Sequence, residues 1–190
     1  MKPGVRALGV AESSRGDEST LAGVVVRADR VVDGFGFETC TVGGRDATDA
    51  AVSLVDRLDR ADVRYVFFAG IAPAWFNLFD LHEIADRVDR PVLSVSFEES
   101  PGLEPALEDA FDGDDLAERL ATYRAQPDRR RITIGGDAVF ARAVGLDDED
   151  AAAVVRAFTP EGGRPEPLRV ARAAARAADE RFVADESDGD

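Results

Sequence analysis

The first 45 residues alternate between short apolar runs and polar turns, the pattern of successive β-strands. Val5–Ala11 is largely apolar and ends at the polar segment ESSRGDES. Residues 20–29 and 30–42 are rich in β-branched and aromatic side chains and meet at Asp29-Arg30, so they predict a hairpin. We therefore expect three consecutive antiparallel strands.

The pattern changes to a helical period at Asp46. Apolar residues then recur three and four positions apart, at Ala50, Ala51, Leu54, Val55 and Leu58, which predicts an amphipathic helix. Residues 63–70 and 90–97 are continuous apolar runs typical of strands buried on both faces, and a helix is predicted between them over 78–88. This order predicts an α/β fold with a mixed sheet of about five strands and flanking helices.

The second half of the chain predicts a small C-terminal hairpin and further helices. Helices are expected over 103–110 and 114–124, and a hairpin over 130–145 with its turn at Gly135-Gly136. Asp147 is the expected N-cap of the next helix, and Pro167 begins the last one. We predict a single domain over residues 1–183 and an acidic disordered tail over 184–190.

The composition limits the chemistry that the chain can perform. The hydrophobic fraction of 45% is enough for a core, and the formal net charge is −15, with Lys2 as the only lysine. Abundant Asp with almost no Lys is typical of proteins from salt-rich cytoplasms, where charge repulsion is screened. No apolar run reaches the ~20 residues of a membrane span, so we expect a soluble, cytoplasmic protein. Because the chain has one cysteine, Cys40, and one histidine, His82, a metal site would consist mainly of carboxylates, which favours Mg²⁺ or Mn²⁺.

Candidate site residues follow the strands that end at Ala11 and Ala69, because parallel sheets bind ligands at the carboxyl ends of their strands. Glu12 is a candidate metal ligand or an exposed loop residue. Trp75 and Phe76 are either core cover or the stacking wall of a base pocket.

Three further polar residues have a structural alternative to a role in the site. Asp46, Asn77 and Asp80 are candidates for the site, but each also stands where it could cap a helix.

A row of arginines is predicted on one face of the last helix. Arg169 and Arg172 are candidate phosphate ligands, and the alternative is a solvated face paired with Glu166 and Asp179. The run from Arg129 to Arg131 is a weaker candidate.

Five segments together resemble the archaeal endonuclease dU family, also known as domain-of-unknown-function family 99. They are RALGVAES, VGGRDAT, AGIAPAWFNLFD, RPVLSVSF and RPEPLRVA, and they span nearly the whole chain in the family's order. The resemblance implies an RNase H-like, endonuclease V-like fold. It also implies a DNA-processing function that acts on deaminated bases, uracil or hypoxanthine, with carboxylates that hold Mg²⁺ or Mn²⁺.

The chain departs from the pattern of that family at two metal ligands, where aspartates are replaced by Ala11 and Ala69. One hypothesis is therefore a metal-dependent endonuclease whose catalytic residues are Glu12, Asp46 and Asp80, with Glu12 and Asp46 on the metal.

A second hypothesis is an inactive nuclease-fold binding module in which Trp75, Phe76 and Asn77 contact a base of DNA or RNA, or a small ligand. A third is a scaffold whose exposed Trp75 meets a protein partner.

Overall fold

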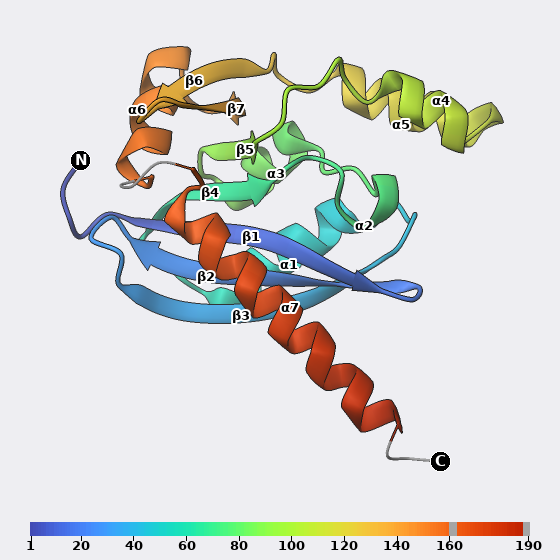
Figure 1. The fold of residues 1–190 in the computed structure, drawn as a ribbon, viewed down its shortest axis with the longest axis horizontal. Coiled ribbons are helices and arrows are strands. Elements are labelled where there is room, and N and C mark those ends of the chain that lie inside the picture. The colour runs from blue at the N-terminus through green and yellow to red at the C-terminus, as the bar shows by residue number, and fades with distance from the viewer. Residues whose placement is uncertain (160–162, 188–190) are drawn as a thin grey trace.

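The computed structural model describes residues 1–159 and 163–187 (Figure 1). Three long strands come first, and helices then alternate with shorter strands. The elements in chain order are β1 (Arg6–Arg15), β2 (Glu18–Arg27), β3 (Val32–Thr41), α1 (Ala47–Leu58), β4 (Val63–Ala69), α2 (Pro73–Phe76), α3 (Leu81–Val88), β5 (Val92–Ser96), α4 (Glu104–Ala110), α5 (Gly113–Arg124), β6 (Arg130–Ile134), β7 (Asp137–Val144), α6 (Asp148–Ala157) and α7 (Glu166–Ser187).

The strands form one mixed sheet in the order β3-β2-β1-β4-β5-β7-β6. β1, β4 and β5 are parallel, and the pairs β1–β2 and β2–β3 are antiparallel, as predicted. The mixed α/β sheet and the C-terminal hairpin are as predicted, but the sheet has seven strands rather than about five. β7 pairs antiparallel with β5, from Val92 opposite Val144 to Ser96 opposite Phe140, so the hairpin extends the sheet to seven strands. This pairing satisfies the backbone groups that β5 would otherwise expose at an edge.

Helices cover both faces of the sheet, and α7 crosses in front of β1 and β2 in Figure 1 while α1 lies behind them. Alternate residues of β1 face the two layers. Leu8 and Val10 belong to the core under α1, whereas Ala11 packs with Ala171 of α7. At Gly9 a Cβ atom would lie 2.3 Å from the backbone of Pro167, so only glycine allows α7 to approach β1 this closely.

Two boundaries differ from the prediction. The helix expected over 78–88 begins at Leu81, because the side chain of Asp80 accepts hydrogen bonds from the backbone N–H groups of His82 and Glu83 and caps it there. Helix α7 continues to Ser187. Residues 184–187 are therefore helical rather than part of a disordered tail, and residues 188–190 lie outside the described residues.

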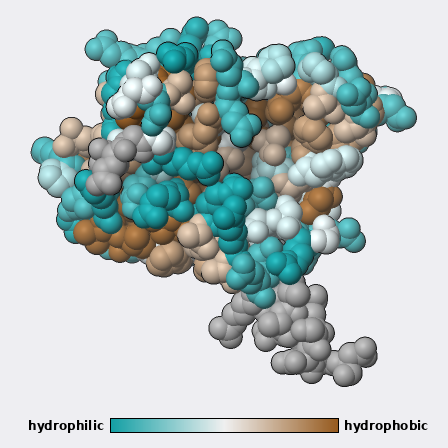
Figure 2. Space-filling model, viewed as in Figure 1, coloured by the Kyte–Doolittle hydropathy of each residue, from teal (hydrophilic) through white to brown (hydrophobic). Residues whose placement is uncertain are grey.

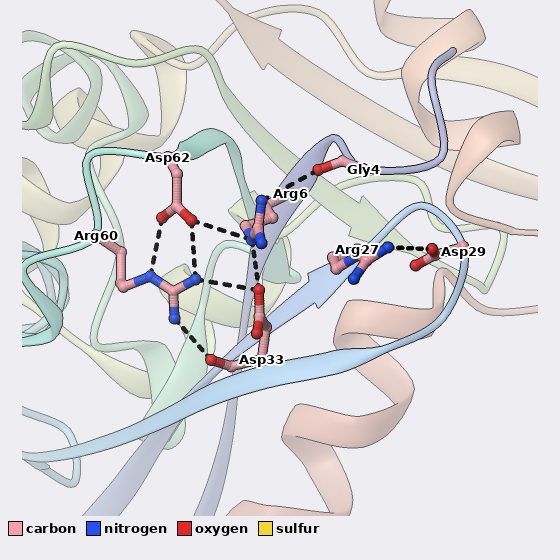
Figure 3. Close-up of polar contacts among 7 residues, drawn as sticks. All are labelled: Gly4, Arg6, Arg27, Asp29, Asp33, Arg60 and Asp62. Carbon is pink, nitrogen blue, oxygen red and sulfur yellow. Dashed lines mark hydrogen bonds and ion pairs between the residues drawn. The ribbon is translucent and has the colours of Figure 1, made fainter.

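An ion-pair network joins the amino ends of β1 and β4 to β3 (Figure 3). Asp33 accepts hydrogen bonds from Arg6 and Arg60, and Asp62 pairs with both arginines at 2.8 to 3.0 Å. The hydrogen bond from Arg6 holds the pKa of Asp33 below its usual value. The network lies at the opposite end of the strands from their carboxyl ends, so its role is to fasten the sheet.

The outer strand β3 carries exposed apolar side chains. Phe35 is 54% exposed and Phe37 is 41% exposed, and Figure 2 shows apolar surface over this part of the molecule. Across the described residues, no helix is long and apolar enough to cross a membrane.

Candidate functional site

Two cavities open at the carboxyl ends of β4 and β5. The first, here called the aromatic cavity, has a volume of about 270 Å³. It is lined by Gly70, Ile71, Ala72, Ser94, Ser96, Glu98, Ser100, Gly102, Leu103, Tyr123, Arg129, Phe140 and Arg142. The second, here called the Arg172 cavity, has a volume of about 260 Å³. It is lined by Ala69, Gly70, Val95, Ser96, Phe97, Glu98, Arg164 and Arg172.

The two cavities lie on opposite faces of the sheet and meet at its end. Ser94 faces the aromatic cavity, and the next residue, Val95, faces the Arg172 cavity, as the alternation of a strand requires. Gly70, Ser96 and Glu98 line both. Gly70 has a φ of +86°, and its N–H donates to the carbonyl of Val95 at 2.9 Å, so the chain turns sharply between the cavities.

The aromatic cavity combines ring faces with positive charge. The guanidinium of Arg129 lies 4.2 Å from the ring centre of Phe140 and donates to Ser96 Oγ at 2.9 Å. Burial, with Arg142 nearby, lowers the pKa of Arg129. Arg142 lies 5.4 Å from the ring centre of Tyr123. Stacked rings and guanidinium groups of this kind bind planar groups and anions.

Ser94 has an available hydroxyl in this cavity. The residue is only 4% exposed, and its hydroxyl forms no hydrogen bond with the part of the chain that the structure describes. Among the described residues, only Arg27 Nε and Arg119 Nε are enclosed without a hydrogen-bond partner, so the Ser94 hydroxyl is open to the cavity. Because this hydroxyl faces a cavity, it can donate to or accept from a ligand.

The two predicted phosphate ligands have different environments. Arg169 pairs with Glu166 at 2.6 Å, which is the structural alternative considered for it. Arg172 lines the second cavity beside Arg164, which lies 4.6 Å from the ring centre of Phe97. Within residues 1–159 and 163–180, neither Arg164 nor Arg172 has a carboxylate partner. The structure therefore places Arg172, but not Arg169, in a candidate site.

The residues at the carboxyl ends of β1 and β4 do not form a metal-binding site. Ala11 and Ala69 lie on the α7 face, where Ala11 is 3% exposed in an apolar cluster with Ala171. Glu12 points to the opposite face, because it follows Ala11 in the same strand. Its carboxylate accepts hydrogen bonds from Ser14 and Ser19 at 2.8 and 3.1 Å.

The predicted cluster of Glu12, Asp46 and Asp80 does not form a metal centre. Glu12 and Asp46 both lie near Cys40, whose thiol pKa is raised to about 12 by burial and by these two carboxylates. The carboxylate of Asp80 caps α3 instead. Among the described residues, no three His, Cys, Asp or Glu side chains are grouped so that they could hold a metal ion.

Asp46 and Asn77 form a structural bridge between β3 and α1. Asn77 is fully buried; its Nδ2 donates to the carbonyl of Thr41 and to Asp46 Oδ1, and its Oδ1 accepts from the N–H of Ala47. Burial opposes the ionisation of Asp46, but hydrogen bonds from Asn77 and Thr41 outweigh it and lower the pKa of Asp46. The prediction that Asn77 lines a base pocket is therefore wrong, because all its polar atoms are used inside the protein.

Trp75 and Phe76 form an exposed aromatic surface rather than a wall of either cavity. Trp75 is 56% exposed, and its ring centre lies 5.9 Å from that of Phe76 and 5.1 Å from that of Phe111. Ala74, Trp75 and Phe76 have φ values of 47°, 53° and 62°. Each left-handed residue costs about 1–2 kcal/mol, so this turn is strained. Arg119 stabilises it by donating to the carbonyl of Phe76 at 2.7 Å.

The sequence did not identify most residues of the two cavities. Tyr123, Arg129, Phe140 and Arg142 come from α5, the loop before β6, and β7. The Arg129–Arg131 run was a signal, but only the pairing of β7 with β5 directs Arg129 into the cavity.

The topology and these strand ends define a class of protein: an RNase H-like fold of the endonuclease V type. The family model for endonuclease dU matches residues 3–179, so the chain belongs to the endonuclease dU family. A UPF0215 protein of Thermococcus kodakarensis is 33% identical over 180 residues, which cover 90% of each chain.

Solved structures agree with this assignment of the fold. A protein of unknown function from Archaeoglobus fulgidus matches with a TM-score of 0.82 and 26% identity over 91% of this chain and 97% of that one. Endonuclease V of Ciona intestinalis was solved with a 24mer DNA that contains an inosine followed by a ribo-adenosine. It matches with a TM-score of 0.62 and 10% identity over 93% of this chain and 87% of that one, and so shares the fold.

Proposed function

We propose that this protein recognises deaminated bases in nucleic acid, and that it binds one unpaired base in the aromatic cavity without the metal-dependent hydrolysis expected of its family. The observation that carries the proposal is the cavity itself, which is walled by Tyr123 and Phe140 and lined by the hydroxyl-bearing side chain of Ser94. Membership of the endonuclease dU family and the endonuclease V fold support nucleic acid as the ligand.

The cavity suits a single base in size and chemistry. Its volume of about 270 Å³ lies just below the range of roughly 300–1,000 Å³ for drug-sized ligands. Aromatic and guanidinium planes stack on bases, and the Ser94 hydroxyl can both donate to and accept from a base edge. A base must leave the double helix to enter such a cavity, and mispaired or single-stranded bases do so at the lowest cost.

Trp75 provides a second contact for the same strand. It lies in the segment that directly follows the cavity-lining residues Gly70, Ile71 and Ala72. An exposed indole held by a strained turn is a suitable platform for a neighbouring base, and stacking of this type contributes about 1–3 kcal/mol per base. We therefore assign Trp75 the role of an exposed platform rather than that of a pocket wall, which was one of the alternatives that the sequence left open.

Binding is tested with fluorescein-labelled single-stranded oligonucleotides that carry one central deoxyuridine or deoxyinosine, in EDTA and at high salt. We expect tighter binding than to an unmodified strand. Phe140→Ala should reduce the affinity about tenfold. Phe37→Ala should not change the affinity, because Phe37 is exposed on β3, at the edge of the sheet away from β7. Equal affinity of Phe140→Ala and wild type would refute the assignment of the cavity.

Hydrolysis is tested separately with the same oligonucleotides and Mg²⁺ or Mn²⁺. We expect no cleavage, because the described carboxylates form no metal-binding group. Metal-dependent nicking that disappears in Glu12→Ala or Asp46→Ala, and persists in Glu83→Ala, would instead establish the enzyme with a relocated cluster.

A further inference from the structure

We propose that the Arg172 cavity is a metal-independent binding site for a phosphate group, in which Arg172 and Arg164 supply the positive charge. The proposal rests on the proposed function in one respect: the phosphate belongs to the nucleotide whose base enters the aromatic cavity.

Four arginines without an ion pair to the described carboxylates line the two cavities of this acidic protein. Other arginines, among them Arg57, Arg87 and Arg124, pair with carboxylates at 2.6 to 2.8 Å. Arg129, Arg142, Arg164 and Arg172 line the two cavities, and none has a carboxylate within ion-pair distance among the residues described. In a chain with a net charge of −15, four such arginines at one place indicate a site that takes a negative ligand.

The Arg172 cavity is suited to a phosphate rather than a metal. Its lining contains two guanidinium groups and one carboxylate, that of the exposed residue Glu98. Alanine stands at position 69, and the neighbouring Ala11 is buried against α7. Guanidinium groups repel a cation but form two parallel hydrogen bonds with phosphate oxygens. The cavity therefore provides directly the positive charge that a metal ion would supply.

The position of the two cavities makes a nucleotide the expected ligand. They share Gly70, Ser96 and Glu98, so a base in one and its phosphate in the other can belong to one nucleotide. The ligand class that follows is a nucleoside monophosphate unit within a strand, held at its base and at its phosphate.

The site is tested by titration calorimetry in EDTA with inorganic phosphate, deoxyuridine and deoxyuridine 5′-monophosphate. We expect phosphate to bind to the wild type, and the monophosphate to bind at least tenfold more tightly than the nucleoside. Arg172→Gln should remove that tenfold advantage. Arg176→Gln is the matched control, because Arg176 is an exposed residue one turn further along α7 and lines neither cavity.

The outcomes separate this proposal from the proposed function. Suppose that inorganic phosphate binds to the wild type but not to Arg172→Gln, that deoxyuridine does not bind, and that the monophosphate binds no more tightly than phosphate. The phosphate site is then supported and the base cavity is refuted. If phosphate does not bind without Mg²⁺ or Mn²⁺, or binds equally to wild type and Arg172→Gln, the phosphate site is refuted. Circular dichroism of each variant confirms that it is folded.

The phosphate site also predicts how the salt dependence of oligonucleotide affinity differs between the same two variants. Each phosphate contact adds about 0.7 to the slope of log affinity against log salt for a single strand. Arg172→Gln should reduce the slope by about that amount, whereas Arg176→Gln should leave it unchanged.

Discussion

Replacement of Asn77 by alanine should destabilise the protein strongly, although Asn77 lies in a loop. The fully buried side chain makes three hydrogen bonds, at 2.8 Å to the carbonyl of Thr41, 2.6 Å to Asp46 Oδ1 and 2.9 Å from the N–H of Ala47. A neutral hydrogen bond contributes about 1 kcal/mol and one to a charged group about 2 kcal/mol. Loss of two neutral bonds and one charged bond therefore costs about 4 kcal/mol. That is a large fraction of a typical stability of about 5–15 kcal/mol.

The assay is equilibrium unfolding in urea, followed by circular dichroism at pH 7. Ser53→Ala is the control, since it removes one partly buried hydrogen bond to the charged carboxylate of Glu38 and should cost only about 2 kcal/mol. A loss for Asn77→Ala no larger than that of the control would refute the structural role of this bridge.

The effect should also depend on pH, because Asn77 lowers the pKa of Asp46 from its usual 3.8. A carboxylate whose pKa is lower in the folded state stabilises the protein above its unfolded pKa and loses this contribution as pH falls through the folded pKa. The stability difference between wild type and Asn77→Ala should therefore be greatest above pH 4 and narrow below it. A difference that stays constant down to pH 2 would contradict the link between Asn77 and Asp46.

Three further predictions concern stability and reactivity. Gly9→Ala should cost about 3 kcal/mol or more in urea unfolding, because its Cβ would overlap the backbone of Pro167; a cost below 1 kcal/mol would mean that α7 can move away from β1. Arg119→Ala should cost about 2–4 kcal/mol, since this 5% exposed residue donates to three carbonyl groups, two of them in the Gly43-Gly44 turn. The substitution should also change the fluorescence of Trp75. An unchanged fluorescence spectrum would count against the role of Arg119 in the aromatic turn. The Cys40 thiol, 3% exposed and with a pKa of about 12, should not react with iodoacetamide at pH 8 until urea unfolds the protein; rapid labelling of the native state would contradict its burial.

The sequence by itself determined the elements and the fold family. Periodicity distinguished the helix after Asp46 from the strands on either side of it, because side-chain spacing is a local property of the backbone. Asp147 caps its helix as predicted, with Asp150 N–H as donor, since capping involves residues only three positions apart. The five family segments identified the endonuclease V-type fold, which the comparisons confirm.

The tertiary structure decided which residues meet. Glu12 and Ala11 are neighbours in sequence but face opposite layers, so Glu12 does not replace a carboxylate on the α7 face. The hairpin of β6 and β7 joins β5 through long-range pairing, and that pairing brings Arg129 and Phe140 to the strand ends.

The surroundings of each polar side chain likewise depend on distant segments. Asn77 is buried because Thr41, Asp46 and Ala47 surround it. Arg172 faces a cavity because α7 packs across β1 and β4. Hydrogen bonds and burial of this kind depend on elements that are distant in sequence, and local patterns contain no information about them.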